Sequence, residues 1–387
     1  MIFYIATFFL GLLLDFKSGK TRNNETWRKL FVFWFFIFSC FGYMTGSDWR
    51  GYELDFYYQN TDNFLYASEG GFGLIFKIMY HLTHDYWITV GVLKCLFLYT
   101  LIRWLRMITP FWLSILAITI LNTDTFGLGF ILIDNPLRYM VASIFINLAV
   151  EQLLLKKRVY AILLMLLAVT CHNSTLFYLL TLIPIFVLCD RLFNVNRILI
   201  VAIYVVIIIF VSVADNLVFL KDSILQAIRM RVSGFESYSS YVTEDTATLF
   251  SIGSLIKYFL FVCVLLTRDY IAKVYDKGRF LYGITIVFFF FDRILVAIPT
   301  GSRLLLVFNF FTVLYFVLLL RNKRIWGYAY IFLMLVTAGR NIWNSYQYIP
   351  YSNSIPYIIT GHKPYSERSI NNPKAFTERT GKHIDSE

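Results

Sequence analysis

The sequence predicts an all-α protein that crosses a membrane many times, and three observations lead to this fold class. Of its 387 residues, 58% are hydrophobic and 15% are charged, whereas soluble domains average about 45–50% apolar and about 25% charged residues. Apolar runs such as 201–211, 284–291 and 304–320 contain almost no charge, and a helix needs about 20 apolar residues to cross a hydrocarbon core. These runs lack the period-two alternation of barrel strands, so their backbone groups must be satisfied within helices.

Reading the apolar runs in chain order gives a polytopic bundle of about twelve transmembrane helices, within a range of about ten to thirteen. They are expected at residues 2–14, 29–44, 86–105, 108–122, 136–155, 159–171, 174–189, 197–214, 251–267, 280–298, 303–320 and 325–338. The first run has no basic segment before it and no small-residue cleavage site, so we interpret it as a retained helix rather than a signal peptide.

Basic residues gather in short clusters between the apolar runs and indicate the topology. These clusters lie at 17–28, 103–106, 156–158, 191–197, 268–279 and 321–324, and counting helices places all of them on one side. Basic clusters favour the cytoplasm. The same count places both termini on the opposite side of the membrane, so both are expected outside. The segments expected to form an outward-facing cavity on that side are 45–71, 122–136, 215–250, 299–303 and the chain from 339 onward.

The net charge of +11 is therefore explained by topology. The sequence has no basic stripe interleaved with aromatic residues on a polar domain, which argues against a nucleic-acid partner.

This topology requires one break in an apolar stretch. The run from Val159 to Leu188 must form two half-length helices that turn near His172, where the polar segment Cys171–Thr175 interrupts the run. A single long tilted helix is the alternative.

Residues 1–355 are expected to form a single polytopic membrane domain and residues 356–387 a polar C-terminal tail, mobile beyond Gly361. The five cysteines lie in or at the ends of apolar runs without CxxC spacing, so neither a disulfide nor a zinc site is implied. We expect no metal and no cofactor.

One outer segment combines charges with aromatic rings. Its candidate residues are Asp48, Trp49, Arg50, Tyr52 and Glu53. A guanidinium presents a planar fork that suits phosphate, a carboxylate can act as a general base, and aromatic faces stack on sugar rings. The alternative is a solvated loop with an aromatic belt at the membrane interface.

Arg138 follows Pro136 at the start of an expected helix, on the side where the charge rule disfavours a cation. Arginines at membrane depth are costly and usually face a partner or a water-filled cavity. The start of a helix also directs backbone N–H groups toward a bound anion. The alternative is that Arg138 extends its guanidinium to the lipid headgroups.

Two further candidates are His172 and Arg303. A histidine at a polar break can accept a proton or hydrogen-bond a substrate, although a lone histidine in an apolar setting is also commonly structural. Asp292 and Arg293 can neutralise each other inside the bundle, so Arg303, in the turn beyond them, is the arginine expected to be available outside. Together, these residues suit a substrate with an anionic phosphate, a polar body and a lipid tail.

The order and spacing of several motifs resemble the EpsG-type family of polysaccharide polymerases, within the wider Wzy class, over roughly residues 1–355. The matching stretches are Gly42–Trp49 followed by Tyr52, Asn135–Arg138, Cys171–Ser174 and Ile349–Tyr351. The family pattern often has an arginine just before the glycine-rich part of the first motif. This chain has Phe41, Gly42 and Tyr43 there, and Arg50 is a candidate to replace that arginine.

The resemblance implies a membrane glycosyltransferase of the bacterial inner membrane whose active site faces the periplasm. Its substrates would be undecaprenyl-diphosphate-linked repeat units of an O-antigen, capsule or exopolysaccharide. A sugar hydroxyl of one unit attacks the anomeric carbon of another, and undecaprenyl diphosphate leaves. A chain-length regulator and a flippase of the same pathway are the partners that this implies.

On this hypothesis, Arg138 and Arg303 stabilise the leaving diphosphate. Proton abstraction falls to Asp48 or His172. The residues that position the substrate are Trp49, Arg50, Tyr52 and Glu53. Two alternatives remain: an intramembrane O-acyltransferase of glycans, for which a buried histidine is the key residue, and a flippase, for which inverted repeats with broken helices are typical.

Overall fold

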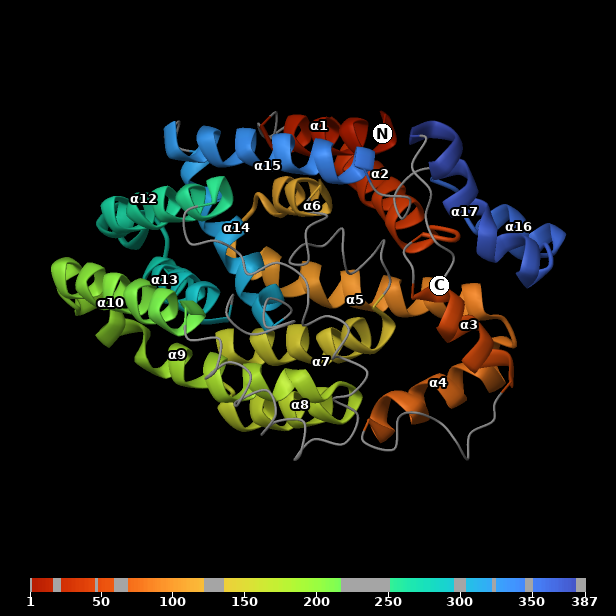
Figure 1. Ribbon diagram of the computed structural model, residues 1–387, viewed down its shortest axis with the longest axis horizontal. Helices are drawn as coiled ribbons and strands as arrows, with labels where there is room; N and C mark the ends of the chain where they lie inside the picture. The colour runs from red at the N-terminus through yellow and green to blue at the C-terminus, as the bar shows by residue number, and fades with distance from the viewer. Residues whose placement is uncertain are drawn as a thin grey trace. The chain divides into compact units, whose positions relative to one another are not determined.

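The computed structural model describes residues 2–16, 22–45, 48–58, 69–121, 136–216, 251–295, 304–321, 325–344 and 351–380. Within these ranges the chain forms sixteen α-helices and a short 3-10 helix, without a β-strand (Figure 1). The predicted all-α fold class is therefore confirmed.

The helices are α1 (Ile2–Phe16), α2 (Arg22–Cys40), α3 (Trp49–Tyr58), α4 (Gly70–Thr83), α5 (Tyr86–Ile108), α6 (Trp112–Leu121), α7 (Leu137–Leu154), α8 (Arg158–Cys171), η3 (Asn173–Thr175), α9 (Leu176–Asn194), α10 (Arg197–Asn216), α12 (Ile252–Val274), α13 (Gly278–Leu295), α14 (Leu306–Arg321), α15 (Ile325–Asn344), α16 (Ile355–Thr360) and α17 (Tyr365–Thr380). Every helix expected from an apolar run overlaps one of these over its described residues. Helices α3, α4, α16 and α17 were not expected.

Three helical segments among the described residues are long and apolar enough to cross a membrane: Tyr86–Ile108, Leu137–Leu154 and Asn173–Asn194. Shorter apolar helices accompany them, α8 and α10 among these. Large apolar side chains on α9 and α10 face outward, including Leu180 at 64% and Phe210 at 71% exposure. Such surfaces are typical of a membrane protein, because lipid replaces water around them. Twelve membrane spans remain a prediction.

The chain divides into two compact units, one formed by residues 1–183 and 331–387 and the other by 184–330. In the first unit α7 packs against both α5 and α8, and α1 packs against α6 (Figure 1). Helices α3 and α4 contact each other and α5. In the second unit α13 packs against α10, α12 and α14. The division between a membrane domain at 1–355 and a tail remains a prediction.

The second unit contains the expected Asp292–Arg293 ion pair, with both side chains 2% exposed. Lys257 of α12 also pairs with Asp292. The prediction that Asp292 and Arg293 neutralise each other inside the bundle is confirmed.

The expected break at His172 is also confirmed. Helix α8 ends at Cys171, and His172 is extended with φ −160° and ψ 114° before η3 and α9 begin. A single continuous helix across this segment, the alternative reading, is wrong.

Helix α2 ends at Cys40, four residues before its expected end at Met44. The reason is a pairing with the C-terminal segment: the Ser354 N–H donates to the Phe41 carbonyl at 2.7 Å, and the Tyr43 N–H donates to the Ser352 carbonyl at 2.9 Å. These bonds require extended backbone after Cys40, so the helix cannot continue.

The described part of the expected mobile tail, up to Thr380, is largely helical. Helix α17 covers Tyr365–Thr380, and its Arg368 is only 6% exposed. Its polar side chains include hydrogen-bonding groups that anchor this segment to the rest of the first unit.

Candidate functional site

The Glu69 carboxylate lies at the centre of a polar cluster in the first unit. Its Oε2 accepts a hydrogen bond from Arg138 Nη1 at 2.9 Å, and its Oε1 lies 2.8 Å from His172 Nδ1. Oε1 also accepts the Asn173 N–H at 3.1 Å. Arg138 Nε in turn donates to the Tyr52 hydroxyl at 3.1 Å. We refer to Tyr52, Glu69, Arg138 and His172 as the Glu69 cluster.

Four helix ends bring these side chains together. Glu69 immediately precedes α4, Arg138 occupies the first turn of α7, and His172 follows the last residue of α8. Tyr52 lies in the first turn of α3. Helix ends suit such a site because their side chains project beyond the apolar bundle while the packed helices fix their positions.

A glycine permits the close approach of α4 to α8. A Cβ atom at Gly71 would lie 2.2 Å from the Thr170 Oγ1 and 2.9 Å from the Thr170 Cβ. Only a residue without a side chain allows the start of α4 to lie this close to the end of α8. The contact places Glu69, two residues before Gly71, beside His172, two residues after Thr170.

The cluster combines one buried anion with two partly exposed groups. The Glu69 side chain is 6% exposed, whereas those of Arg138 and His172 are 32% and 23% exposed. Burial acts to raise the pKa of the Glu69 carboxyl, but the hydrogen bond and charge of His172, the charge of Arg138 and the Asn173 N–H outweigh it. The pKa of Glu69 therefore lies below its ordinary value, and the group is ionised at neutral pH.

Tyr52 supports Arg138 from α3. Burial raises the pKa of the Tyr52 phenol, so its hydroxyl remains protonated when it accepts the Arg138 N–H. Asp48 is exposed in the turn before α3, and its carbonyl accepts the Tyr52 N–H at 3.2 Å. Tyr52 thus links the predicted segment around Asp48 to the predicted Arg138, and Glu69 links Arg138 to the predicted His172.

The other predicted residues of α3 belong to a second group. Glu53 is 2% exposed, and its Oε2 accepts from Arg368 Nη1 at 2.6 Å while its Oε1 accepts from Trp87 Nε1 at 3.1 Å. The Arg368 guanidinium lies over the Trp49 ring, 5.7 Å from its centroid. We refer to Trp49, Glu53, Trp87 and Arg368 as the Glu53 cluster.

Arg50 lies at the edge of this second group. Its guanidinium is 5.9 Å from the Trp49 ring centroid, and its backbone carbonyl accepts from the Tyr365 hydroxyl at 3.3 Å. Its Nε is buried and has no hydrogen-bond partner within the described part of the chain. Arg303, the remaining predicted residue, lies outside the described residues.

Sequence reasoning missed Glu69 and Arg368. Glu69 lies within the expected outer segment 45–71, and the signal for it in the sequence is a single acidic residue before the Gly70–Gly71 pair. Arg368 was assigned to a mobile tail. Among the described residues, no group of three or more His, Cys, Asp and Glu side chains is arranged to hold a metal ion.

The fold and the Glu69 cluster define a helical membrane protein with a charged site where several helices end. The chain belongs to the EpsG family, because the sequence model of that family matches residues 26–357. Membership associates the chain with exopolysaccharide polymerases. No curated protein sequence and no solved structure matched the chain.

Proposed function

We propose that the chain polymerises undecaprenyl-diphosphate-linked oligosaccharide repeat units into a surface polysaccharide, by glycosyl transfer at the periplasmic face of the inner membrane. The observation that carries the proposal is the Glu69 cluster. One buried carboxylate holds both a guanidinium suited to a diphosphate and an imidazole suited to accept a proton. Membership of the EpsG family supports the same class of reaction.

His172 acts as the general base in this proposal. Because an ionised carboxylate only accepts hydrogen bonds, the His172 Nδ1 carries a hydrogen and donates it to Glu69. In the neutral ring, Nε2 is then the atom with a free electron pair, as in hydrolases where a carboxylate fixes the histidine tautomer. His172 is preferred to Asp48 as the base because Glu69 holds it beside Arg138.

Arg138 stabilises the leaving diphosphate. A guanidinium presents N–H donors in a planar fork that matches the oxygens of a phosphate, and the Arg138 fork is bonded to the Tyr52 hydroxyl and the Glu69 carboxylate. Those two bonds fix the plane of the fork, so its charge is already in position when the leaving group gains negative charge. Preorganisation of this kind is most effective at a partly water-excluded helix end.

The proposed reaction forms one glycosidic bond, breaks one bond to the diphosphate and transfers one proton. A hydroxyl oxygen of the acceptor unit bonds to the anomeric carbon of the donor, and the bond from that carbon to the diphosphate oxygen breaks. The bonding electron pair leaves with undecaprenyl diphosphate beside Arg138. The hydroxyl proton passes to the His172 Nε2 and then to solvent.

The test is a chain-growth assay with the purified full-length protein in lipid nanodiscs. Undecaprenyl-diphosphate repeat units from cells that lack this protein would be added, and products separated by length. We expect a ladder of lengthening glycans, with one undecaprenyl diphosphate released for each linkage.

Single units that stay unlinked under these conditions would overturn the proposal. In sealed vesicles, movement of the units across the bilayer without linkage would instead support a flippase. Transfer of an acyl group to the glycan would support an O-acyltransferase.

A further inference from the structure

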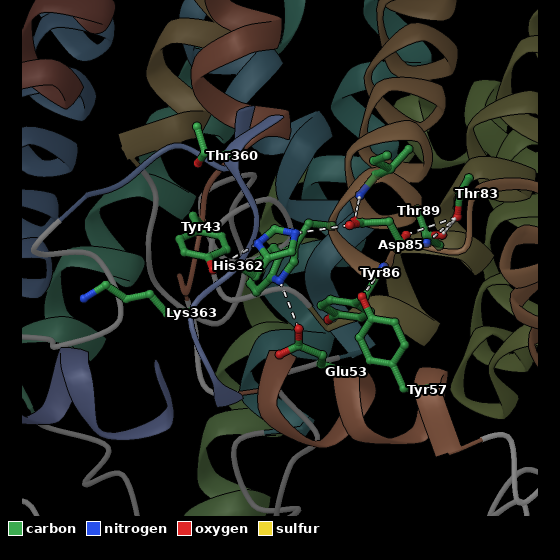
Figure 2. Close-up of polar contacts among 12 residues, drawn as sticks. Tyr43, Glu53, Tyr57, Thr83, Asp85, Tyr86, Thr89, Thr360, His362 and Lys363 are labelled. Atoms are coloured by element: carbon green, nitrogen blue, oxygen red, sulfur yellow. Dashed lines mark hydrogen bonds and ion pairs between the residues drawn. The ribbon is translucent and has the colours of Figure 1, made fainter. Parts of the chain in front are cut away.

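The C-terminal segment 351–380 is bound to the part of the chain that leads into α3. Its first residues pair with the end of α2 through the Tyr43 and Ser354 backbone bonds described above. Further along, His362 lies between Tyr43 and Asp85: its Nδ1 is 3.1 Å from the Tyr43 hydroxyl, and its Nε2 is 3.1 Å from the Asp85 Oδ2 (Figure 2). The Tyr43 and Tyr357 rings stack with centroids 4.3 Å apart.

Asp85 is a structural anchor for this contact. Its Oδ1 accepts the Ile88 N–H at 2.9 Å and thereby caps the start of α5. His362 thus attaches the C-terminal segment to a fixed helix end. From this anchor the chain continues into α17, whose first residue, Tyr365, donates its hydroxyl to the Arg50 carbonyl.

The strongest link between α17 and α3 is the Arg368–Glu53 ion pair. The side chains are 7% and 2% exposed, so the pair is shielded from water. Arg368 Nε also donates to the Lys363 carbonyl at 2.6 Å, which fixes the guanidinium on its own segment. Both Glu53 oxygens are occupied by protein donors, Arg368 and Trp87.

Helix α3 needs such support because it is only ten residues long, and isolated helices shorter than about 12–15 residues are marginal in water. Tyr52 and Glu53 are consecutive in α3, so the position of one fixes the position of the other. Tyr52 meets Arg138, and Glu53 meets Arg368. The end of α3 is held at Tyr57, whose hydroxyl accepts the Tyr86 N–H at 3.3 Å (Figure 2).

We infer that Arg368 is a positioning residue for the site: by pairing with the buried Glu53 it holds α3 where Tyr52 orients the Arg138 guanidinium. This assigns Glu53 to the support of α3 rather than to contact with substrate. Arg368 lies beyond residue 357, where the family match ends. The consequence for glycan synthesis rests on the proposed function, whereas the consequence for α3 does not.

The test compares the full-length wild-type protein in nanodiscs with Arg368→Gln, Arg368→Lys and the double variant Glu53→Gln/Arg368→Gln. Amide hydrogen exchange in α3 and chain growth would both be measured. Removing Arg368 alone leaves a buried carboxylate without its cation, so we expect α3 amides to exchange on the order of 10- to 100-fold faster. The turnover number for chain growth should fall, and the KM for the lipid-linked substrate should change less.

Arg368→Lys should retain part of the protection because it keeps the charge. The double variant should recover protection and activity relative to Arg368→Gln, because it removes the unpaired carboxylate. Such recovery would not occur if Arg368 touched the substrate. Glu367→Gln is the matched control on the same helix, since its ion pair with Lys363 is exposed and contributes little.

Unchanged exchange in α3 of Arg368→Gln would overturn the inference. So would a double variant that regains α3 protection without regaining activity. If Arg368→Gln does not fold, α3 exchange and chain growth are compared between the wild type, Arg368→Lys and the double variant. Failure of the wild-type protein to extend glycans would contradict the proposed function, while the exchange measurement would still decide the role of Arg368.

Discussion

The Arg138 Nη1 lies 2.9 Å from the Glu69 Oε2, although the two residues are 69 positions apart in the chain. Arg138 occupies the first turn of α7, where the helix dipole disfavours a cation. The Glu69 carboxylate compensates for this and at the same time holds His172. A cation that seemed misplaced by the charge rule is therefore part of a built cluster, and each member can be tested separately.

Replacement of Arg138 tests whether its charge is needed for glycan linkage. We expect Arg138→Ala to insert and fold but to lose long-chain glycan while single lipid-linked units accumulate, with a turnover about 100- to 1,000-fold lower. Arg138→Lys should be intermediate, because lysine keeps the charge but cannot contact Tyr52 and Glu69 with one planar fork. Chain growth of purified protein gives both values.

The control for Arg138 is Arg158→Ala, which removes an exposed arginine at the start of α8. It should extend glycans at the wild-type rate. Long chains of normal length in Arg138→Ala would show that this guanidinium does not stabilise the leaving group.

Glu69→Gln tests the support of His172. The glutamine side chain has one acceptor oxygen in place of two, so its NH2 group must face either the His172 Nδ1 hydrogen or the Arg138 fork. We expect turnover to fall about 100-fold or more, the range in which general-base catalysis contributes. Apparent substrate affinity should change less, because Glu69 is 6% exposed.

Glu69 and His172 should also act as a unit. The double variant Glu69→Gln/His172→Gln is expected to be little slower than His172→Gln alone, since each change disables the same proton acceptor. Multiplicative losses would mean that Glu69 does not act through His172.

The twelve expected apolar runs each overlap a helix, because membrane helices must satisfy their own backbone groups and so show continuous apolar composition. Helix α4 was missed although it is largely apolar, because Lys77 and His81 interrupt its run. Helices α3 and α17 escaped because their stability comes from tertiary contacts, Glu53 with Arg368 above all. Arg138 and His172 could be singled out as polar groups at breaks in apolar runs. Glu69 could not, since its partners lie 69 and 103 positions away.

The stability of the cluster should depend on pH in a direction set by Glu69. Its pKa in the folded protein lies below the ordinary 4.5. Ionised Glu69 therefore stabilises the fold fully above about pH 4.5, and this contribution is lost as the pH falls through the lower folded-state value. In thermal unfolding, the difference between wild type and Glu69→Gln should shrink as the pH falls below about pH 4.5. A difference that disappears well above that pH would contradict the ion-pair assignment.

The glycines at the start of α4 provide a matched pair of variants for the geometry of the cluster. A Cβ at Gly71 would collide with Thr170 at 2.2 Å, whereas a Cβ at Gly73 meets nothing within 4 Å. Gly71→Ala should cost about 1–3 kcal/mol through overpacking, and Gly73→Ala should stabilise α4 by about 0.5–1 kcal/mol. Because Gly71→Ala pushes α4 away from the end of α8, it moves Glu69 away from His172 and should also slow chain growth. Thermal unfolding and chain growth measured on both variants check this, and equal effects of the two substitutions would show that the close approach of α4 to α8 does not set the site.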